Sequence, residues 1–259
     1  MGQVRNIKLT VAYDGTDYYG FQEQRGTGLP TIQEVLEAAL SKMAGSYIQV
    51  YGAGRTDSGV HARGQVVNFD CTNWPVPTER LALALNGVLP NDIAAVKAED
   101  VAPDFHARFS AQGKTYLYRV YNHNIPSPFE NRYSHYMPSF LDTGAMGKAA
   151  ALLEGTHDFK TFQAANSPVR NTVRTIFQTS VYRESNVIYF SLSGDGFLYN
   201  MVRIITGTLL EIGQGKRSPA TMSDTIAARD RIAAGPTVPG RGLFLEKVYY
   251  NPLQKSAES

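Results

Sequence analysis

The sequence predicts an α+β protein made of two ferredoxin-like α/β halves that share a mostly antiparallel central sheet. The first observation is the order of expected elements in residues 1–101: strand, helix, strand, strand, helix, strand. This is the split βαβ order of a ferredoxin-like unit. The second is that strands and helices follow in a comparable order afterwards, without sequence self-similarity. We expect a first half at 1–103, a second half at 104–252 and a frayed tail at 253–259.

The elements of the first half follow from hydrophobic periodicity and capping signals. Residues 7–13 alternate apolar and polar side chains, which is typical of a half-buried strand. The clearest helix begins after Thr31, which has capping-box spacing to Glu34, and it ends at Gly45. The other expected elements are strands at 48–51, 65–69 and 93–101 and a helix at about 78–88.

The second half is expected to combine long strands with two C-terminal helices. Alternation is clearest at 114–121, which predicts a strand. Ser218 and Pro219 form an N-cap and first-turn pair for a helix that extends to about residue 234. The other expected elements are a helix at 146–153, strands at 172–181, 186–193 and 243–250, and a helix at 197–212.

Composition excludes several classes of protein. The 259 residues are 43% hydrophobic and 19% charged, as in a globular chain, and no apolar run is long enough for a membrane span. The N-terminus runs directly into a strand pattern, so we expect no signal peptide. The single cysteine, Cys71, fits a reducing cytoplasm. The five histidines are scattered, and the glycine-rich stretches lack the context of a nucleotide-binding loop.

One polar stretch, residues 54–62, stands between two expected strands. It contains three features that suit a reactive loop: Arg55, Asp57 and Gly59. Glycines allow close approach to a ligand, and a carboxylate beside a cation keeps its charge at neutral pH. Such a carboxylate can act as a nucleophile or a general base. An Asx-turn in an ordinary hairpin loop explains the same residues, so the stretch alone leaves both interpretations open.

Basic and aromatic residues elsewhere indicate a possible RNA surface. Tyr116 lies on an expected strand, and Arg203 lies inside an otherwise apolar helix. Rings and arginines on a sheet surface can stack on bases and bind phosphates. Taken singly, however, a strand tyrosine is usually a core residue, and an arginine at the edge of such a helix usually reaches solvent.

The motifs together resemble those of the tRNA pseudouridine synthase A family. The resemblance extends over nearly the whole chain, and its most specific part is the run Arg55-Thr56-Asp57-Ser58-Gly59-Val60-His61. The other matching stretches are 13–15, 19–22, 64–67, 104–110, 114–116, 197–203, Gly207 and 242–243. Phe21 stands where some members have tryptophan, and we assign no role to Tyr199 and Asn200, where some relatives have two histidines.

This resemblance implies the pseudouridine synthase fold and a cofactor-free, metal-free isomerisation of uridine in tRNA. The expected targets are uridines of the anticodon stem-loop at tRNA positions 38, 39 or 40. Asp57 would be the catalytic aspartate, either attacking C1′ or removing the C2′ proton, and Arg203 would pair with it. Tyr116 would stack on the base and help to remove the C5 proton.

The predicted substrate contacts and partners follow from the same resemblance. The substrate-binding candidates are Tyr116, Arg55, Arg108, His61 and Arg25, with Arg170 and Arg174 as further phosphate contacts. A homodimer is expected, located in the cytoplasm without a membrane partner. Two alternatives are a non-catalytic RNA-binding module, which does not require Asp57, and a nucleoside hydrolase, which normally requires a second carboxyl group.

Overall fold

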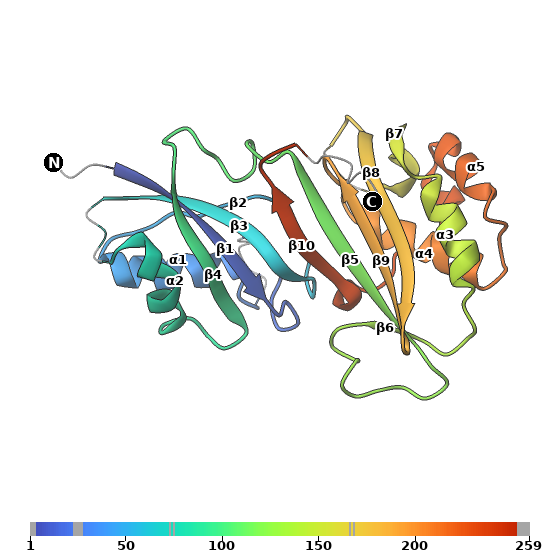
Figure 1. The fold of residues 1–259 in the computed structure, drawn as a ribbon, viewed down its shortest axis with the longest axis horizontal. Helices are drawn as coiled ribbons and strands as arrows, with labels where there is room; N and C mark the ends of the chain where they lie inside the picture. The colour runs from blue at the N-terminus through green and yellow to red at the C-terminus, as the bar shows by residue number, and fades with distance from the viewer. Residues whose placement is uncertain are drawn as a thin grey trace, which may run out of the picture. The chain divides into compact units, whose positions relative to one another are not determined.

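The computed structural model describes residues 4–22, 28–72, 74, 76–165, 167 and 169–252. These residues form two compact units. The first contains residues up to Gln112 together with Leu245–Asn251, and the second contains Gly113–Phe244. Both units combine helices with sheet strands, and most of the strand pairs are antiparallel (Figure 1). The predicted fold class, α+β with a mostly antiparallel central sheet, is confirmed.

The first unit continues along the chain to Gln112. The side-chain amide of Asn6 donates to the carbonyls of Ala102 and Phe105 at 3.2 and 2.7 Å, and Asn68 accepts the amide of Ala107 at 2.8 Å. These side-chain bonds hold residues 102–107 on the first unit. At the other end of the chain, the amide of Gln112 donates to the carbonyl of Tyr249 at 2.7 Å.

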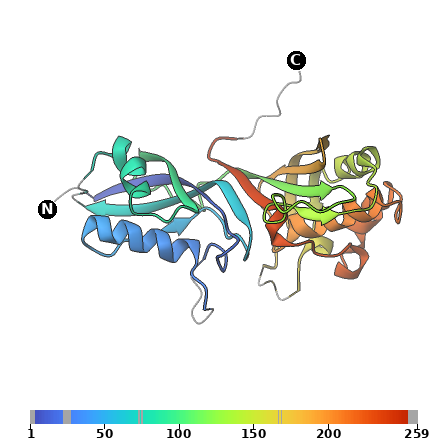
Figure 2. The ribbon, with the colours of Figure 1, turned by 90° about the horizontal axis from the view of Figure 1, so that it is seen from below.

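The first unit has the strand order β4-β1-β3-β10. Its strands are β1 (Val4–Tyr13), β2 (Tyr51–Gly52), β3 (His61–Thr72), β4 (Ile93–Val101) and most of β10 (Leu243–Tyr249), and its helices are α1 (Ile32–Ala44) and α2 (Thr78–Asn86). Strand β1 pairs antiparallel with both β3 and β4, and the short strand β2 pairs with β3. Helix α1 runs alongside the strands of its unit (Figure 2).

The sequence signals for β1 and α1 are confirmed. Along β1, Ile7, Leu9 and Val11 are fully buried, while the alternate residues are partly exposed or polar. Thr31 and Glu34 form the complete capping box, and Gly45 ends α1 with a left-handed φ of 69°. A glycine at this position costs less than any other residue, because it has no Cβ.

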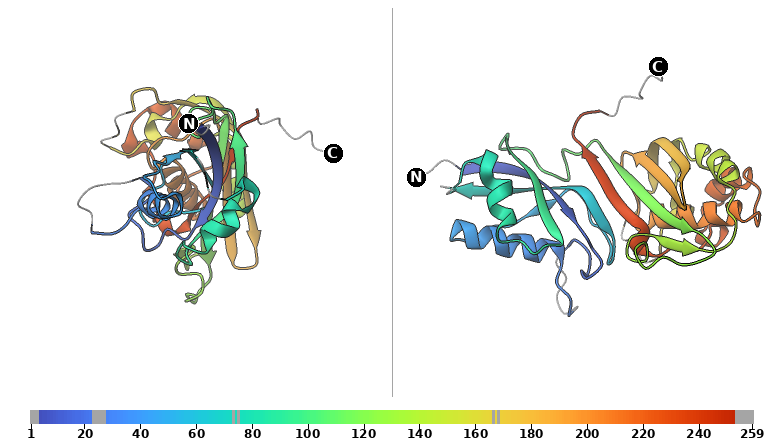
Figure 3. Two further views of the ribbon diagram at one scale, coloured as in Figure 1. Left: turned by 90° about the vertical axis from the view of Figure 1, so that its left-hand side faces the viewer. Right: turned by 60° about the horizontal axis from the view of Figure 1, so that its bottom comes forward.

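The second unit has the strand order β5-β9-β8-β7. Its strands are β5 (Gly113–Asn122), β6 (His135–Met137), β7 (Gly155–Asp158), β8 (Val173–Glu184) and β9 (Val187–Gly194), and its helices are α3 (Thr143–Ala151), α4 (Met201–Gly213) and α5 (Thr221–Ala228). Strand β6 pairs parallel to β5, and the other strand pairs are antiparallel. Helix α3 contacts α4, α5 and β8 (Figures 1 and 3).

Helix α4 is the buried centre of the second unit. Its residues between Met201 and Gly213 are buried with few exceptions, and Arg203 is one of these exceptions. Residue 207 must be a glycine because the backbone at Pro236 passes close to it: a Cβ there would collide with the carbonyl oxygen of Pro236. Burial raises the pKa of Tyr118, whose hydroxyl donates to the carbonyl of Pro239 at 2.7 Å.

Two predicted helices in the second half have different limits. The helix predicted at 197–212 begins at Met201, because Asn200 adopts a left-handed φ of 59° and breaks the helical path. The helix predicted at 218–234 ends at Ala228, where Arg229 has a φ of 52°. Strands β6 and β7 are additional to the predicted order. None of the helices in the described part of the chain has the length and apolar character that a membrane crossing requires.

Candidate active site

Asp57 lies in the first unit, on the loop between β2 and β3. Its side chain is partly exposed, while Arg55 is exposed and Thr56 is buried. The amide of Val60 donates to the carbonyl of Asp57 at 3.1 Å and closes a turn. The loop thus places a carboxylate at the surface while its neighbour on the chain points into the protein.

The buried side of this loop is held by residues 13–21. The hydroxyls of Tyr13 and Thr56 lie 2.8 Å apart, and the amide of Phe21 donates to the carbonyl of Thr56 at 3.0 Å. Gly20 has a φ of 81°, and a Cβ there would lie 2.5 Å from that same carbonyl oxygen. These contacts give a physical reason for the sequence motifs around Tyr13 and Gly20, which would otherwise have no evident link to Asp57.

Burial keeps Tyr13 in its neutral form. The loss of solvent raises the pKa of Tyr13 well above its ordinary value, and hydrogen bonds from Thr56 and Gln65 oppose this only in part. Gln65 is fully buried and donates to the carbonyl of Gly54 at 2.8 Å. Two uncharged side chains, Tyr13 and Gln65, therefore hold the loop at Thr56 and at Gly54, just before Asp57.

His61, a predicted substrate contact, supports the loop from inside. Its side chain is 1% exposed, and its Nδ1 atom accepts the amide of Gly15 at 3.1 Å. A carboxylate oxygen of Asp14 lies 3.1 Å from the same nitrogen. A Cβ at Gly15 would collide with the carbonyl oxygen of Val60, so the two segments are packed closely here. A direct role of His61 in RNA binding stays a prediction.

Tyr116 lies in the second unit, on strand β5. It is paired with Leu192 of β9 and is 8% exposed. Its ring packs edge-on against Phe197, with 5.1 Å between the ring centroids. Phe197 belongs to the turn that leads from β9 into α4, so this ring contact joins the strand to the segment that carries Arg203.

Arg203 lies in the first turn of α4 and is partly buried. Its Nε atom donates to the carbonyl of Val238 at 2.8 Å, and Nη1 donates to the side-chain oxygen of Asn200 at 2.6 Å. Asn200 thus has a positioning role that the sequence did not suggest. The available signal was an amide three residues before the arginine, a spacing at which side chains on a helix meet.

The remaining candidates are placed as follows. Arg108 is exposed beside Phe109, in the first unit, and Arg170 and the partly exposed Arg174 lie in the second unit. Arg25 lies outside the described residues. Asp57, Arg55, His61 and Arg108 therefore belong to the first unit, and Tyr116 and Arg203 to the second.

Comparison with known proteins identifies the family. The sequence model described as "tRNA pseudouridine synthase" matches residues 9–110 and 149–251. Proteins named tRNA pseudouridine synthase A are similar over nearly the full length of both chains. One from Moorella thermoacetica is 51% identical over 94% of this chain and 99% of the relative, and one from Acetivibrio thermocellus is 44% identical over 95% and 100%.

The chain belongs to the tRNA pseudouridine synthase family. As a tRNA pseudouridine synthase it is an isomerase that converts uridine into pseudouridine in tRNA. Another similar relative, from Halalkalibacterium halodurans, is 49% identical over 93% of this chain and 91% of the relative. The two matched segments contain Asp57 and Arg203, while Tyr116 falls between them.

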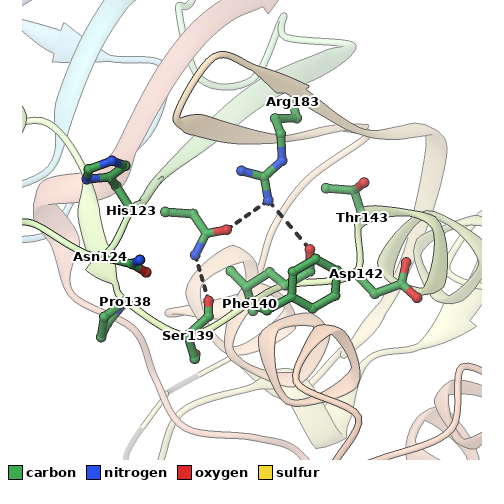
Figure 4. A pocket seen from close by; sticks show the side chains of 10 residues that line it. His123, Asn124, Pro138, Ser139, Phe140, Asp142, Thr143 and Arg183 are labelled. Carbon is green, nitrogen blue, oxygen red and sulfur yellow. Dashed lines mark hydrogen bonds between the residues drawn. The ribbon is translucent and has the colours of Figure 1, made fainter.

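A separate cavity of about 450 Å³ lies in the second unit of this synthase (Figure 4). It is lined by residues 122–124, by residues 138–143 and by Arg183, and none of the predicted site residues lines it. Arg183 donates to the side-chain oxygen of Asn122 at 2.8 Å, so its guanidinium group is already engaged (Figure 4). Within the described ranges, no group of three or more His, Cys, Asp or Glu residues is placed to hold a metal ion.

Proposed function

We propose that Asp57 supplies the catalytic carboxylate and that the enzyme modifies uridines at positions 38, 39 or 40 in the anticodon stem-loop of tRNA. The observation that carries this proposal is the construction of the Asp57 loop. Buried Tyr13, Thr56 and Gln65 and the crowded Gly20 fix the backbone around one partly exposed carboxylate. A reacting group needs this kind of fixed position, since small displacements of a catalytic group cost large factors in rate.

The isomerisation breaks the N1–C1′ bond of the uridine and forms a C5–C1′ bond. Asp57 can attack C1′ to give a glycosyl ester, or remove the C2′ proton to give a glycal. In either case the base leaves as an anion and turns, and C5 then bonds to C1′; this releases the Asp57 carboxylate from the ester or, in the glycal route, is accompanied by return of the proton from Asp57 to C2′. The C5 proton is then lost to a base, and N1 gains a proton. A uridine inside a stem must first leave its stack, so base flipping is implied.

Tyr116 and Arg203 are proposed to serve the same reaction. The edge contact of Tyr116 with Phe197 leaves a ring of fixed orientation, suited to stacking on a base. Arg203 is held by Asn200 and by the carbonyl of Val238, which suits a cation that maintains the charge of a carboxylate. Arg55, Arg108, Arg25 and His61 are proposed as contacts to the RNA.

The test of the proposed chemistry is tritium release from tRNA labelled at uridine C5. The wild type should release tritium, and Asp57→Asn should lose at least a thousandfold in rate while it still binds tRNA. Equal release by Asp57→Asn would overturn the role of Asp57. Free uracil among the products would indicate a nucleoside hydrolase instead.

Two further variants test the supporting residues. Arg203→Met should keep tRNA affinity but lose turnover, and loss of binding alone would contradict its proposed role. Tyr116→Phe retains the ring and should retain more activity than Tyr116→Leu if stacking is its main contribution.

Target positions and assembly require their own measurements. Three tRNA transcripts that carry uridine only at 38, only at 39 or only at 40 should each release tritium, and a transcript without uridine at these positions should not. We also propose a homodimer and a cytoplasmic location. Light scattering of the purified chain at several concentrations should give twice the mass of one chain, and a single-chain mass would contradict the dimer.

A further inference from the structure

Three rings of the first unit form a partly exposed row. The ring centroids of Tyr51 and His106 lie 5.3 Å apart, and those of His106 and Phe109 lie 4.4 Å apart. Tyr51 is 38% exposed and Phe109 is 76% exposed, while His106 between them is less exposed than either. We call Tyr51, His106 and Phe109 the aromatic row. The Phe109 ring therefore has apolar surface in water that a ligand could cover.

The backbone that carries the aromatic row is fixed by buried amides. Asn68 is 4% exposed; its side chain accepts the amide of Ala107 at 2.8 Å and donates to Asn6, which is 5% exposed. Asn68 is also the residue opposite Tyr51 in the β2–β3 pair. One buried side chain therefore fixes the segment that bears His106 and Phe109 beside the strand that bears Tyr51.

The turn at residues 106–110, which carries Phe109, is closed by hydrogen bonds between its own residues. The amide of Ser110 donates to the carbonyl of His106 at 2.9 Å, and the hydroxyl of Ser110 accepts the amide of His106 at 3.1 Å. The amide of Arg108 donates to Nδ1 of His106 at 3.1 Å, which fixes the orientation of this ring. Phe109 is thus presented on a preorganised turn, so that little conformational entropy is lost when a ligand binds.

The charge next to the aromatic row is positive. Arg108 is exposed, and its guanidinium carbon lies 5.8 Å from the centre of the Phe109 ring. The exposed carboxylate of Asp104 lies on the same segment but four residues earlier. An exposed ring beside an arginine matches the chemistry of a nucleotide, in which a flat base is attached to a phosphate.

One member of the aromatic row, Tyr51, is close in sequence to the Asp57 loop. Strand β2 consists of Tyr51 and Gly52, and the chain continues directly into that loop. The amide of Ala53 donates to the carbonyl of Val66 at 2.8 Å, which ties the connection to β3. An RNA bound at Asp57 therefore has this row on the same unit, with Tyr51 on the strand that leads into the Asp57 loop.

We propose that the aromatic row is a second RNA-binding site, where Phe109 stacks on an unpaired base of the tRNA other than the reacting uridine. Arg108 binds the phosphate next to that base. His106 packs against Phe109, and Tyr51 packs against His106, so these two rings support the stacked ring. This inference rests on the proposed function, because it takes the tRNA substrate as the ligand. It assigns to Tyr51, His106 and Phe109 a contact that the reaction itself does not require.

The test measures affinity for a tRNA transcript in an Asp57→Asn background, in which the RNA is not converted. Phe109→Ala should weaken binding about fivefold or more, the lower end of what is measured when a stacking ring is removed. Phe109→Trp should bind within twofold of the parent or more tightly. Phe129→Ala is the matched control, because Phe129 is 88% exposed but lies in the second unit, and it should leave affinity unchanged.

The salt dependence of binding separates the two components of the site. Phe109→Ala should leave the slope of log affinity against log salt unchanged, since stacking releases no counterions. Arg108→Gln should reduce that slope by about one, as expected for the loss of one phosphate contact. Equal affinity of Phe109→Ala and the parent, or an equal loss in Phe129→Ala, would overturn the proposal. Binding is measured without turnover, so failure of the catalytic role of Asp57 would be seen separately in the tritium assay.

Discussion

The Asp57 loop and the Arg203 turn are held in different ways. In the first unit, the loop depends on contacts with other segments of the chain. Tyr13 at the end of β1 and Gly20 in the segment after it contact Thr56, and Gln65 of β3 binds the carbonyl of Gly54. In the second unit, Arg203 donates to a side chain only three residues away, that of Asn200, and to the backbone carbonyl of Val238. The first arrangement should be sensitive to added atoms, and the second to the loss of one side chain.

The largest effect is expected where the Asp57 loop is most crowded. Gly20→Ala adds a Cβ that would lie 2.5 Å from the carbonyl oxygen of Thr56, at a φ of 81°. We expect a loss of about 3 kcal/mol in unfolding free energy, as overpacking and left-handed strain add together. We also expect more than a tenfold loss of activity, measured by denaturant unfolding and tritium release.

Gly45→Ala is the matched control for this change. Gly45 has a φ of 69°, but a Cβ there would have no neighbour within 4 Å. It should therefore cost only the strain of a left-handed residue, about 1 kcal/mol, with activity retained. Equal losses of activity in the two variants would show that crowding at Thr56 does not control the position of Asp57.

The second effect tests the local anchor of Arg203. Asn200 combines a left-handed φ of 59° with the hydrogen bond to Arg203. Asn200→Gly keeps the backbone unstrained and removes the anchor, whereas Asn200→Ala removes the anchor and keeps the strain. Both should lose about tenfold in kcat, while the alanine variant should be less stable than the glycine variant by about 1 kcal/mol. Full activity of Asn200→Gly would exclude the anchoring role.

The sequence predicted the elements whose signals are local. Helix α1 was predicted with both ends, because Thr31, Glu34 and Gly45 are adjacent in the chain to the residues that they cap. The strand pattern of β1 was equally clear, because one of its faces is buried along its length. The glycine-rich stretch around Asp57 was recognised as a loop between strands for the same reason.

Contacts between distant residues could not be predicted in this way. The first unit extends beyond residue 103 because Asn6 and Asn68 bind the segment at 102–107, and no periodicity encodes such side-chain bonds. The left-handed conformations of Asn200 and Arg229, which set two helix limits, were missed because residues other than glycine rarely adopt them. The burial of His61 likewise depends on the packing of residues 14–15 against its strand.

A third effect concerns the buried hydroxyl pair beneath the Asp57 loop. Tyr13 and Thr56 are 4% and 6% exposed, and their oxygen atoms lie 2.8 Å apart. Tyr13→Phe and Thr56→Val should each cost about 1–2 kcal/mol, because each leaves a buried hydroxyl with one partner fewer. The double variant should cost less than the sum of the two, with a coupling of about 1 kcal/mol in denaturant unfolding. Strict additivity would show that the pair does not act as a unit.

The smallest effect is a pH dependence of the stability that the second unit contributes. Burial, aided by the charge of Arg241, lowers the pKa of His135 on strand β6. Between the folded pKa and the ordinary value of about 6.5, the unfolded chain binds more protons, so the neutral ring stabilises the fold above about pH 6.5. This contribution is lost as the pH falls through the folded pKa.

His135→Phe, which cannot take up a proton, should therefore flatten the decline in unfolding free energy between about pH 7.5 and 5. The measurement is denaturant unfolding at several pH values. His157→Phe is the control, because it replaces another histidine of the same unit. An unchanged slope in His135→Phe would mean that this imidazole is protonated as easily in the folded chain as in the unfolded one. A flattened slope would show that His135 gives the second unit a proton-linked contribution to its stability.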